Sequence, residues 1–418
     1  MSLTRLTLSL SFREGHKIFK TFRSLSTSSA SLVRSTNKPP GSDSKESILK
    51  EPSESARELL ENAASFNDQV PLNEEQIWST SPYPKGSIPR GQSIYALRPK
   101  VDPTHTSIML FPGQGTQYVG MGRDLIKFPV VQEMFESASA ILGYDLLKLC
   151  VQGPASELNK TVNCQLAVLV CSLAAIEQLR EERPSSIENC IAAAGFSVGE
   201  IAALVFAGCM SFERAVRITK VRAEAMQLAS EMTEGGMLTV LYSPKTRLVD
   251  VCKNAREWAQ NSGVERPECS IANYLFPDCK VIAGHVKALE YIEKNAKSHA
   301  IRRTRRLPVS GAFHTSLMQP AVEPFKLALS NAKLEEPAIA VHSNLDGKMY
   351  SNAKQILYKL PRQIVRPVKW EQTLHILYER PPGEQFPSTF ECGPGSSLRT
   401  ILKNVNFKAA NTFWNIGS

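Results

Sequence analysis

Residues 190–204 have the sequence CIAAAGFSVGEIAAL, in which an apolar run leads into a Gly-x-Ser-x-Gly motif and a second apolar stretch. Residues 190–195 are predicted to form a buried strand, and a helix is expected to begin near Glu200. Gly195 and Gly199 allow a sharp turn that would lift the hydroxyl of Ser197 off the edge of a sheet. The pattern predicts a nucleophilic serine between a strand and a helix. An ordinary glycine-flanked turn is the alternative.

The elements on either side of this turn indicate an α/β fold. Short apolar runs alternate with longer helical patterns beyond residue 104. The predicted strands are 106–111, 190–195, 237–242, 269–274, 280–284, 300–307, 341–343 and 389–391. Helices are predicted at about 245–262 and at 287–297. Between 237 and 307 the order is therefore βαββαβ, which is typical of a ferredoxin-like unit inserted into a larger α/β body.

The first forty residues differ in charge from the rest of the chain. They contain seven Lys or Arg and a single acid, Glu14, whereas the rest has 42 basic and 39 acidic residues. A basic, Ser/Thr-rich and nearly acid-free N-terminus is typical of an organellar transit peptide, mitochondrial in preference to plastid. A basic arm that binds nucleic acid is the alternative, although no aromatic stacking pattern supports it. Residues 41–102 are polar and proline-rich, and we expect a linker or arm.

The composition is that of a globular protein with no membrane span and with free cysteines. Apolar residues make up 42% and charged residues 21% of the 418, as in ordinary globular proteins. The longest apolar run, 166–176, is well short of the roughly 20 residues that span a bilayer, so no membrane span is expected. The nine cysteines are odd in number and contain no C-x-x-C pair, which favours free buried thiols.

Arg222 interrupts an apolar helix face. A helix is expected after Ser211, a good N-cap residue, and one stripe of it is apolar: Ala215, Ile218, Ala225 and Met226. Arg222 lies in that stripe, where a guanidinium needs an anionic partner. A bound ligand and a fixed Asp or Glu of the protein are equally compatible with this pattern.

Two further segments carry polar groups suited to catalysis. His314 follows the run 307–313, where a strand-like segment turns toward a helix, and a helix N-terminus would favour the neutral imidazole of a general base. A structural role is the alternative for any single histidine. The loop 111–122, FPGQGTQYVGMG, has the wrong glycine spacing for a dinucleotide site, but it can aim a backbone N–H at an oxyanion.

Together these segments resemble the malonyl-CoA:acyl carrier protein transacylases, most closely the mitochondrial ones. The matching stretches occur in the family order over about three-quarters of the chain: FPGQGTQYVGMG (111–122), GFSVGEIAALVFAG (195–208), VRAEAM (221–226), NYLFPDCKVIAGH (273–285), LPVSGAFH (307–314), RPVKWEQT (366–373) and ECGPG (391–395). Phe196 departs from the pattern, because many relatives carry His before the nucleophile.

The resemblance implies Ser197 as the nucleophile, His314 as its base and Arg222 as the clamp for the malonyl carboxylate. It further implies that the backbone N–H groups of Gln114 and Val198 form the oxyanion hole. In this family a main-chain carbonyl orients the base, and Gln363 occupies that position.

The resemblance also implies the domain organisation and partners. Residues 1–40 would be a mitochondrial transit peptide for the matrix, 41–102 a linker, and 103–418 the transacylase domain. That domain would comprise an α/β-hydrolase-like large subdomain with a parallel-sheet core, 103–235 and 306–418, and the ferredoxin-like small subdomain 236–305. The partners would be malonyl-CoA and an acidic, phosphopantetheinylated acyl carrier protein. No metal, cofactor or nucleic acid is expected.

Two competing functions share part of this evidence. A serine esterase or thioesterase would have the same turn but would hydrolyse its acyl-enzyme, and no obvious Asp completes a hydrolase triad. A noncatalytic scaffold that binds carrier protein would tolerate loss of Ser197, His314 or Arg222, all of which are present. For carrier-protein docking we expect the basic run Arg302, Arg303, Arg305 and Arg306; charges that protect an edge strand from aggregation are the alternative.

Overall fold

The computed structural model describes residues 102–381 and 383–417. The predicted transit peptide and, except for Asp102, the predicted linker lie outside the described residues.

The larger sheet is parallel and has the strand order β7-β2-β1-β8-β9. Its strands are β1 (Ser107–Phe111), β2 (Cys190–Gly195), β7 (Ala340–His342), β8 (Ser388–Cys392) and β9 (Phe413–Ile416). All five residues of β1, the central strand, are buried, and its sequence SIMLF is almost continuously apolar. Such a run suits a parallel strand that is covered on both faces.

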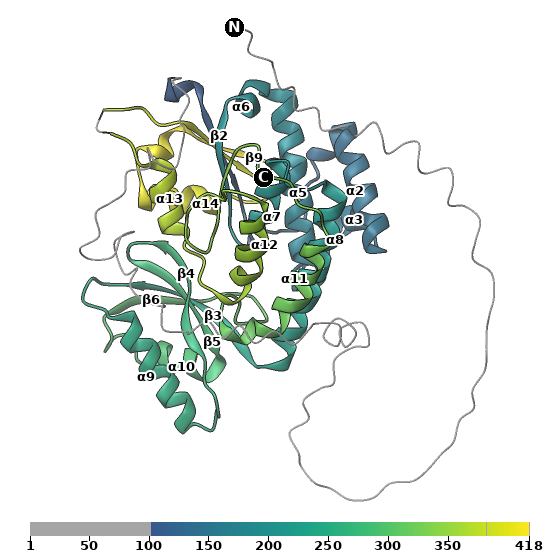
Figure 1. Cartoon of the computed structure of the whole chain (residues 1–418). Helices are drawn as coiled ribbons and strands as arrows, with labels where there is room; N and C mark the ends of the chain where they lie inside the picture. The colour runs from purple at the N-terminus through teal and green to yellow at the C-terminus, as the bar shows by residue number, and fades with distance from the viewer. Residues whose placement is uncertain (1–101, 382, 418) are drawn as a thin grey trace, which may run out of the picture. The chain divides into compact units, whose positions relative to one another are not determined.

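Alternate residues of β1 define two cores. Met109 and Phe111 belong to a core with α2 (Pro129–Leu142), α5 (Thr161–Glu182) and α8 (Phe212–Met232). Ile108 and Leu110 belong to a second core with α13 (Trp370–Tyr378) and α14 (Ser397–Val405). Successive side chains of a strand point to opposite faces, so helices cover this sheet on both sides, as Figure 1 shows. The other helices of this body are α3 (Leu146–Gln152), α4 (Ala155–Leu158), α6 (Pro184–Glu188), α7 (Gly199–Phe206), α11 (Val322–Ser330) and α12 (Ala353–Arg362).

Helix α5 is the main core helix. In the part of the chain that the structure describes, it is the one helix long and apolar enough to cross a membrane by length and composition, but 78% of its apolar window is buried inside the protein. Its residues pack against α8, α7 and α2. An apolar helix enclosed in this way has the surroundings of a core helix.

The smaller sheet is antiparallel and has the order β4-β5-β3-β6. It contains β3 (Gly235–Tyr242), β4 (Cys269–Phe276), β5 (Cys279–His285) and β6 (Ile301–Arg306). Helices α9 (Leu248–Asn261) and α10 (Val286–Lys294) share a core with its strands. The chain order is the predicted βαββαβ, so the fold class, an α/β body with a small antiparallel insert, is confirmed.

Contacts between β4, β5 and α13 join the two sheets. The backbone N–H of Tyr274 on β4 donates to the carbonyl of Val368 (2.9 Å), and Val368 N–H donates to the carbonyl of Ala272 (2.8 Å). Lys280 Nζ on β5 donates to Glu371 Oε2 on α13 at 2.5 Å, and both side chains are only 1% exposed. The inserted unit is therefore held to the larger body by backbone pairing and a buried ion pair.

All nine cysteines are free and buried, as their number and spacing predict. Burial raises the pKa of Cys164 and Cys190 to about 12, so these thiols stay protonated and unreactive near neutral pH.

Candidate active site

Ser197 lies on a tight turn between β2 and α7. Its φ of 55° is left-handed, a strained conformation for a residue with a side chain. The flanking glycines are required by close backbone approach: a Cβ on Gly195 would lie 1.9 Å from Gly199 C and O, and one on Gly199 would lie 2.4 Å from Phe111 O. The predicted serine turn is therefore present, and the strain is held by backbone packing on both sides.

His314 and Gln363 lie beside this serine. His314 Nε2 is 3.0 Å from Ser197 Oγ, and the main-chain carbonyl of Gln363 accepts from His314 Nδ1 at 2.7 Å. A carbonyl oxygen can only accept, so Nδ1 carries the proton and Nε2 is free to accept the serine proton. The structure brings together the three residues to which the sequence assigned nucleophile, base and base-orienting carbonyl.

Arg222 reaches the same hydroxyl from α8. Its side chain is 1% exposed, and Nη2 donates to Ser197 Oγ (3.0 Å) and to Gln363 Oε1 (2.9 Å), while Nη1 donates to Gln165 Oε1. Within residues 102–381 and 383–417 no carboxylate lies within 4.0 Å of the guanidinium, and its Nε has no partner. No Asp or Glu of the described chain therefore pairs with Arg222, as the structural interpretation of this residue required. Its hydrogen-bond partners in the described chain are neutral acceptors, which a ligand carboxylate can replace.

Burial governs the protonation of these groups. Burial, with a smaller contribution from the nearby Arg222 charge, lowers the pKa of His314 to about 4, against the hydrogen bond to Gln363 O. The expectation of a neutral imidazole agrees with this direction, but burial and not a helix N-terminus is the main cause. Burial also lowers the pKa of Arg222 to about 10, which leaves the guanidinium charged at neutral pH.

Gln114 and Val198 are the residues whose backbone N–H groups are expected to form the oxyanion hole. Phe196 N donates to Phe111 O (2.9 Å), and a Cβ on Gly113 would lie 2.4 Å from Phe196 O, so the loop after β1 packs directly onto the serine turn. Among the described residues, neither Gln114 N nor Val198 N donates a hydrogen bond. Both donors are therefore available to an oxyanion formed beside Ser197.

The amide of Gln363 and two residues that the sequence analysis did not single out complete the site. Gln363 Nε2 donates to Ser197 O (3.0 Å) and to Glu200 Oε2 (2.6 Å). Asn344 Oδ1 accepts from Ser197 N at 2.7 Å, and Asn344 Nδ2 donates to Gly195 O at 2.6 Å. Asn344 follows a short strand in the sequence, and Glu200 begins an otherwise apolar helix. The sequence could have marked Glu200 as a site residue, because it is a charged residue in an apolar stretch. No pattern in the residues around Asn344 marks it in this way.

Phe196 packs against an aromatic ring. Its ring centroid is 5.3 Å from that of Trp370, with a T-shaped arrangement. This contact belongs to the core between the central sheet and α13. Phe196 is thus a packing residue in this structure.

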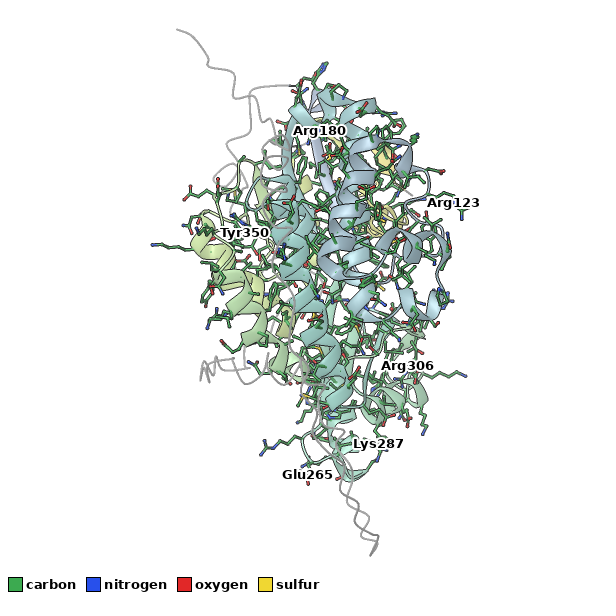
Figure 2. The ribbon with its side chains drawn as sticks, turned by 90° about the vertical axis from the view of Figure 1, so that its right-hand side faces the viewer. Arg123, Arg180, Glu265, Lys287, Arg306 and Tyr350 are labelled. Atoms are coloured by element: carbon green, nitrogen blue, oxygen red, sulfur yellow. The ribbon has the colours of Figure 1, made fainter. Side chains whose placement is uncertain are left out.

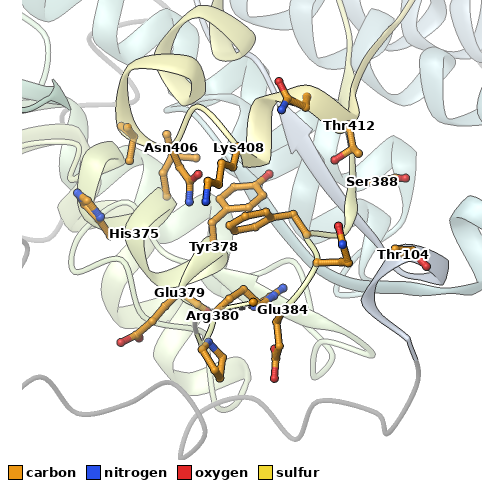
Figure 3. Close-up of a pocket in the computed structure, with 17 residues that line it drawn as sticks. Thr104, His375, Tyr378, Glu379, Arg380, Glu384, Ser388, Asn406, Lys408 and Thr412 are labelled. Atoms are coloured by element: carbon orange, nitrogen blue, oxygen red, sulfur yellow. Dashed lines mark hydrogen bonds between the residues drawn. The ribbon is translucent and has the colours of Figure 1, made fainter.

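A separate cavity of about 800 Å³ lies between α13, β8 and residues 405–412 (Figure 3). Tyr378, His375 and Lys408 are among its lining residues, and none of the catalytic candidates lines it. Tyr378 OH is paired with Thr389 Oγ1 at 2.7 Å. In the described part of the chain no group of three or more His, Cys, Asp or Glu side chains could hold a metal ion. The candidate catalytic residues therefore lie away from this cavity.

A parallel α/β sheet with a strained serine that contacts a histidine and a buried arginine fits the class of serine-dependent acyltransferases. Residues 108–381 match the family model described as the acyl transferase domain, and the chain belongs to this family, among the malonyl-CoA-acyl carrier protein transacylases.

Two curated relatives and one solved structure illustrate this likeness. The chain is 59% identical over 319 residues to the probable mitochondrial malonyl-CoA-acyl carrier protein transacylase of Drosophila melanogaster, covering 76% of this chain and 84% of the relative. It is 52% identical over 311 residues to the mitochondrial malonyl-CoA-acyl carrier protein transacylase of Homo sapiens, covering 74% and 80%. It matches a structure described as a type II PKS acyl-carrier protein in complex with its malonyl-transacylase, with 33% identity, a TM-score of 0.65, and coverage of 74% and 94%.

Proposed function

We propose that this mitochondrial protein transfers the malonyl group from malonyl-CoA to the phosphopantetheine thiol of acyl carrier protein, and so supplies extender units for fatty acid synthesis. The observation that carries the proposal is the position of Ser197 Oγ, which lies 3.0 Å from both His314 Nε2 and Arg222 Nη2. One hydroxyl thus contacts a base and a cation. That combination suits a nucleophile whose acyl group carries a second, negatively charged end.

In the first step, His314 Nε2 accepts the proton of Ser197 as Oγ attacks the thioester carbonyl of malonyl-CoA. The N–H groups of Gln114 and Val198 stabilise the tetrahedral oxyanion, at roughly 3 kcal/mol for each donor. Collapse of the intermediate breaks the C–S bond, and the proton held by His314 passes to the CoA sulfur. The products are free CoA and a malonyl ester of Ser197.

In the second step, the carrier-protein thiol replaces CoA. His314 accepts the thiol proton, the sulfur attacks the seryl ester, and the proton returns to Ser197 Oγ as the new thioester leaves. Because both steps use one base and one serine, the kinetics should be ping-pong.

A hydrolase would differ in the fate of the malonyl-serine. The experiment is to form the acyl-enzyme, remove excess malonyl-CoA and follow the loss of the acyl group with and without holo carrier protein. Slow loss in buffer and rapid transfer to the thiol are expected. Equal rates in both samples, with free malonate as the product, would assign the chain to the hydrolases.

For the carrier protein we propose an acidic partner that docks on β6, the edge strand of the small sheet. Arg302 pairs with Asp278 (3.5 Å) and Arg306 pairs with Glu293 through two bonds of 3.0 and 2.8 Å.

Arg303 and Arg305 are exposed, and no ion pair joins either to a residue of the described chain. Arg306 is labelled in the lower part of Figure 2. Residues 303 and 305 share the opposite strand face from 302 and 306.

Reversing Arg303 and Arg305 to Glu should raise the KM for carrier protein several-fold at low salt and leave the KM for malonyl-CoA unchanged, because opposite charges steer the encounter. Arg217→Glu, an exposed site on α8, is the matched control. Steady-state kinetics with each substrate varied makes the comparison. An unchanged carrier-protein KM would place the docking surface elsewhere.

A further inference from the structure

Glu200 is a fully buried carboxylate that the proposed chemistry does not use. It lies in the first turn of α7, three residues after Ser197, and is 0% exposed. Tyr350 OH donates to its Oε1 at 2.5 Å, whereas Asn344 N (3.2 Å) and Gln363 Nε2 (2.6 Å) donate to its Oε2. Burial raises its pKa to about 7, against these three hydrogen bonds. Both groups that face Oε2 are donors, so Oε2 accepts whether or not the carboxyl is protonated at Oε1.

The partners of Glu200 are the residues that hold the reactive groups. Gln363 accepts from Arg222 through its side chain (2.9 Å) and from His314 through its main chain (2.7 Å). Asn344 accepts from the backbone N–H of Ser197 (2.7 Å). One carboxylate thus contacts two residues that between them contact the nucleophile, the base and the cation.

The chemistry of an amide makes this contact directional. Gln363 has a donor end and an acceptor end, a guanidinium can only donate, and Oε2 of Glu200 here accepts. In the observed orientation Nε2 faces Glu200 and Oε1 faces Arg222. Turning the amide by 180° would place two donors together at Arg222 and two acceptors together at Glu200. Glu200 and the carbonyl of Ser197, which also accepts from Nε2 (3.0 Å), therefore fix the end of Gln363 that is presented to the guanidinium, and Glu200 makes the shorter of the two bonds (2.6 Å).

We propose that Glu200 is a positioning residue, whose carboxylate orients the Gln363 amide and thereby holds Arg222 where it meets the malonyl carboxylate. The inference deepens the proposed function and rests on it. Because the guanidinium has no carboxylate partner of its own in the described chain, its place depends on neutral acceptors, and Gln363 is the acceptor that Glu200 fixes. A misplacement of about 1 Å at such a site can cost about 100-fold in rate.

The test compares three replacements of Glu200. Glu200→Gln keeps the length and the acceptor, Glu200→Met keeps the approximate volume without an acceptor, and Glu200→Asp keeps the charge but is one methylene shorter. The rate of Ser197 acylation by malonyl-CoA and by acetyl-CoA is measured in single turnovers and normalised to active sites. Glu200→Gln should stay within about threefold of the unmodified protein, whereas Met and Asp should lose malonyl transfer by about 100-fold and acetyl transfer by much less.

Glu391→Met is the matched control. Glu391 is also 0% exposed, burial likewise raises its pKa to about 7, and it accepts from the backbone N–H groups of Leu398 and Arg399 at the start of α14. Loss of this carboxylate should lower the melting temperature and leave the malonyl-to-acetyl ratio per active site unchanged. Rescue by Gln and a change in that ratio are effects that a loss of packing alone would not produce.

The inference is overturned if Glu200→Asp, folded by circular dichroism, retains malonyl acylation and the malonyl-to-acetyl ratio within about threefold. It is equally overturned if Glu200→Gln is as slow as Glu200→Met. The Asp variant decides the question if the Met variant does not fold. Absence of a malonyl-serine in the unmodified protein would instead contradict the proposed function, so the two failures are distinguishable.

Discussion

At the scale of single residues, Arg222 is the side chain that we propose to distinguish malonyl from acetyl groups. A planar guanidinium binds a carboxylate through two parallel hydrogen bonds, whereas an acetyl group offers no such partner. Arg222→Ala should therefore reduce malonyl transfer by two to three orders of magnitude, about 3–4 kcal/mol, and acetyl transfer much less. Measuring kcat/KM for both donors checks this. Equal losses would remove Arg222 from substrate choice.

The buried imidazole of His314, the proposed base, should set the pH dependence of acylation. A base must be unprotonated to accept the serine proton, and burial lowers the His314 pKa from 6.5 to about 4. The lowered value moves the loss of the neutral form to lower pH, so the acylation rate should be flat from about pH 6 to 9 and fall only below about pH 5. Single-turnover acylation across this range makes the measurement. Half-maximal activity near pH 6.5 would contradict a buried neutral base.

The sequence around each position identifies Ser197 and Arg222 as candidate site residues, but it does not identify Asn344. Ser197 has flanking glycines, Arg222 interrupts an apolar stripe, and both signals are visible along the chain. Asn344 contacts Ser197 N although 147 positions separate them. That contact arises from the pairing of β2 with β7, and no nearby pattern encodes it.

At the scale of elements, a glycine lets the loop after β1, which carries the proposed oxyanion donor Gln114, approach the serine turn. A Cβ on Gly113 would lie 2.4 Å from Phe196 O, so Gly113→Ala should push the Gln114 N–H away from the oxyanion position. We expect kcat to fall by about 100-fold with a small change in KM, because the interaction exists mainly in the transition state.

Gly236→Ala on β3 is the control, because its Cβ would meet nothing closer than 3.5 Å. Steady-state kinetics of the two variants compares them at equal active-site concentration. If Gly113→Ala raised KM and left kcat unchanged, the loop would bind substrate without stabilising the oxyanion.

The strands show which elements a pattern can predict. β2 has the predicted bounds, β1, β3 and β4 differ by one or two residues at one end, and β5 differs by one residue at each end, because hydrogen bonding between strands sets where each one stops. β9 was not predicted. Its four residues, FWNI, include exposed Trp414 and polar Asn415, and only pairing with β8 makes them a strand.

At the scale of the whole molecule, the Lys280–Glu371 pair joins the inserted unit to the larger body. Removing one partner leaves a buried charge alone, so Lys280→Met should lower the free energy of unfolding by about 3–5 kcal/mol. The double variant Lys280→Met, Glu371→Met should recover most of that loss, since neither charge remains buried. Urea unfolding measures both.

Lys253 and Glu257, an exposed pair on α9, give the comparison. Removing Lys253 should change the free energy of unfolding by less than about 1 kcal/mol, because water screens the interaction. If the Lys280→Met, Glu371→Met variant is no more stable than Lys280→Met, an unpaired buried charge is not the cause of the instability. The pair would then have another role.

Intact-protein mass spectrometry after mixing with malonyl-CoA shows whether Ser197 carries the malonyl group between the two thiols. We expect one malonyl group per chain, mapped to Ser197, absent from Ser197→Ala and removed by holo carrier protein with formation of malonyl-carrier protein. An unmodified protein, an adduct on another residue, or an adduct that holo carrier protein does not discharge would contradict it.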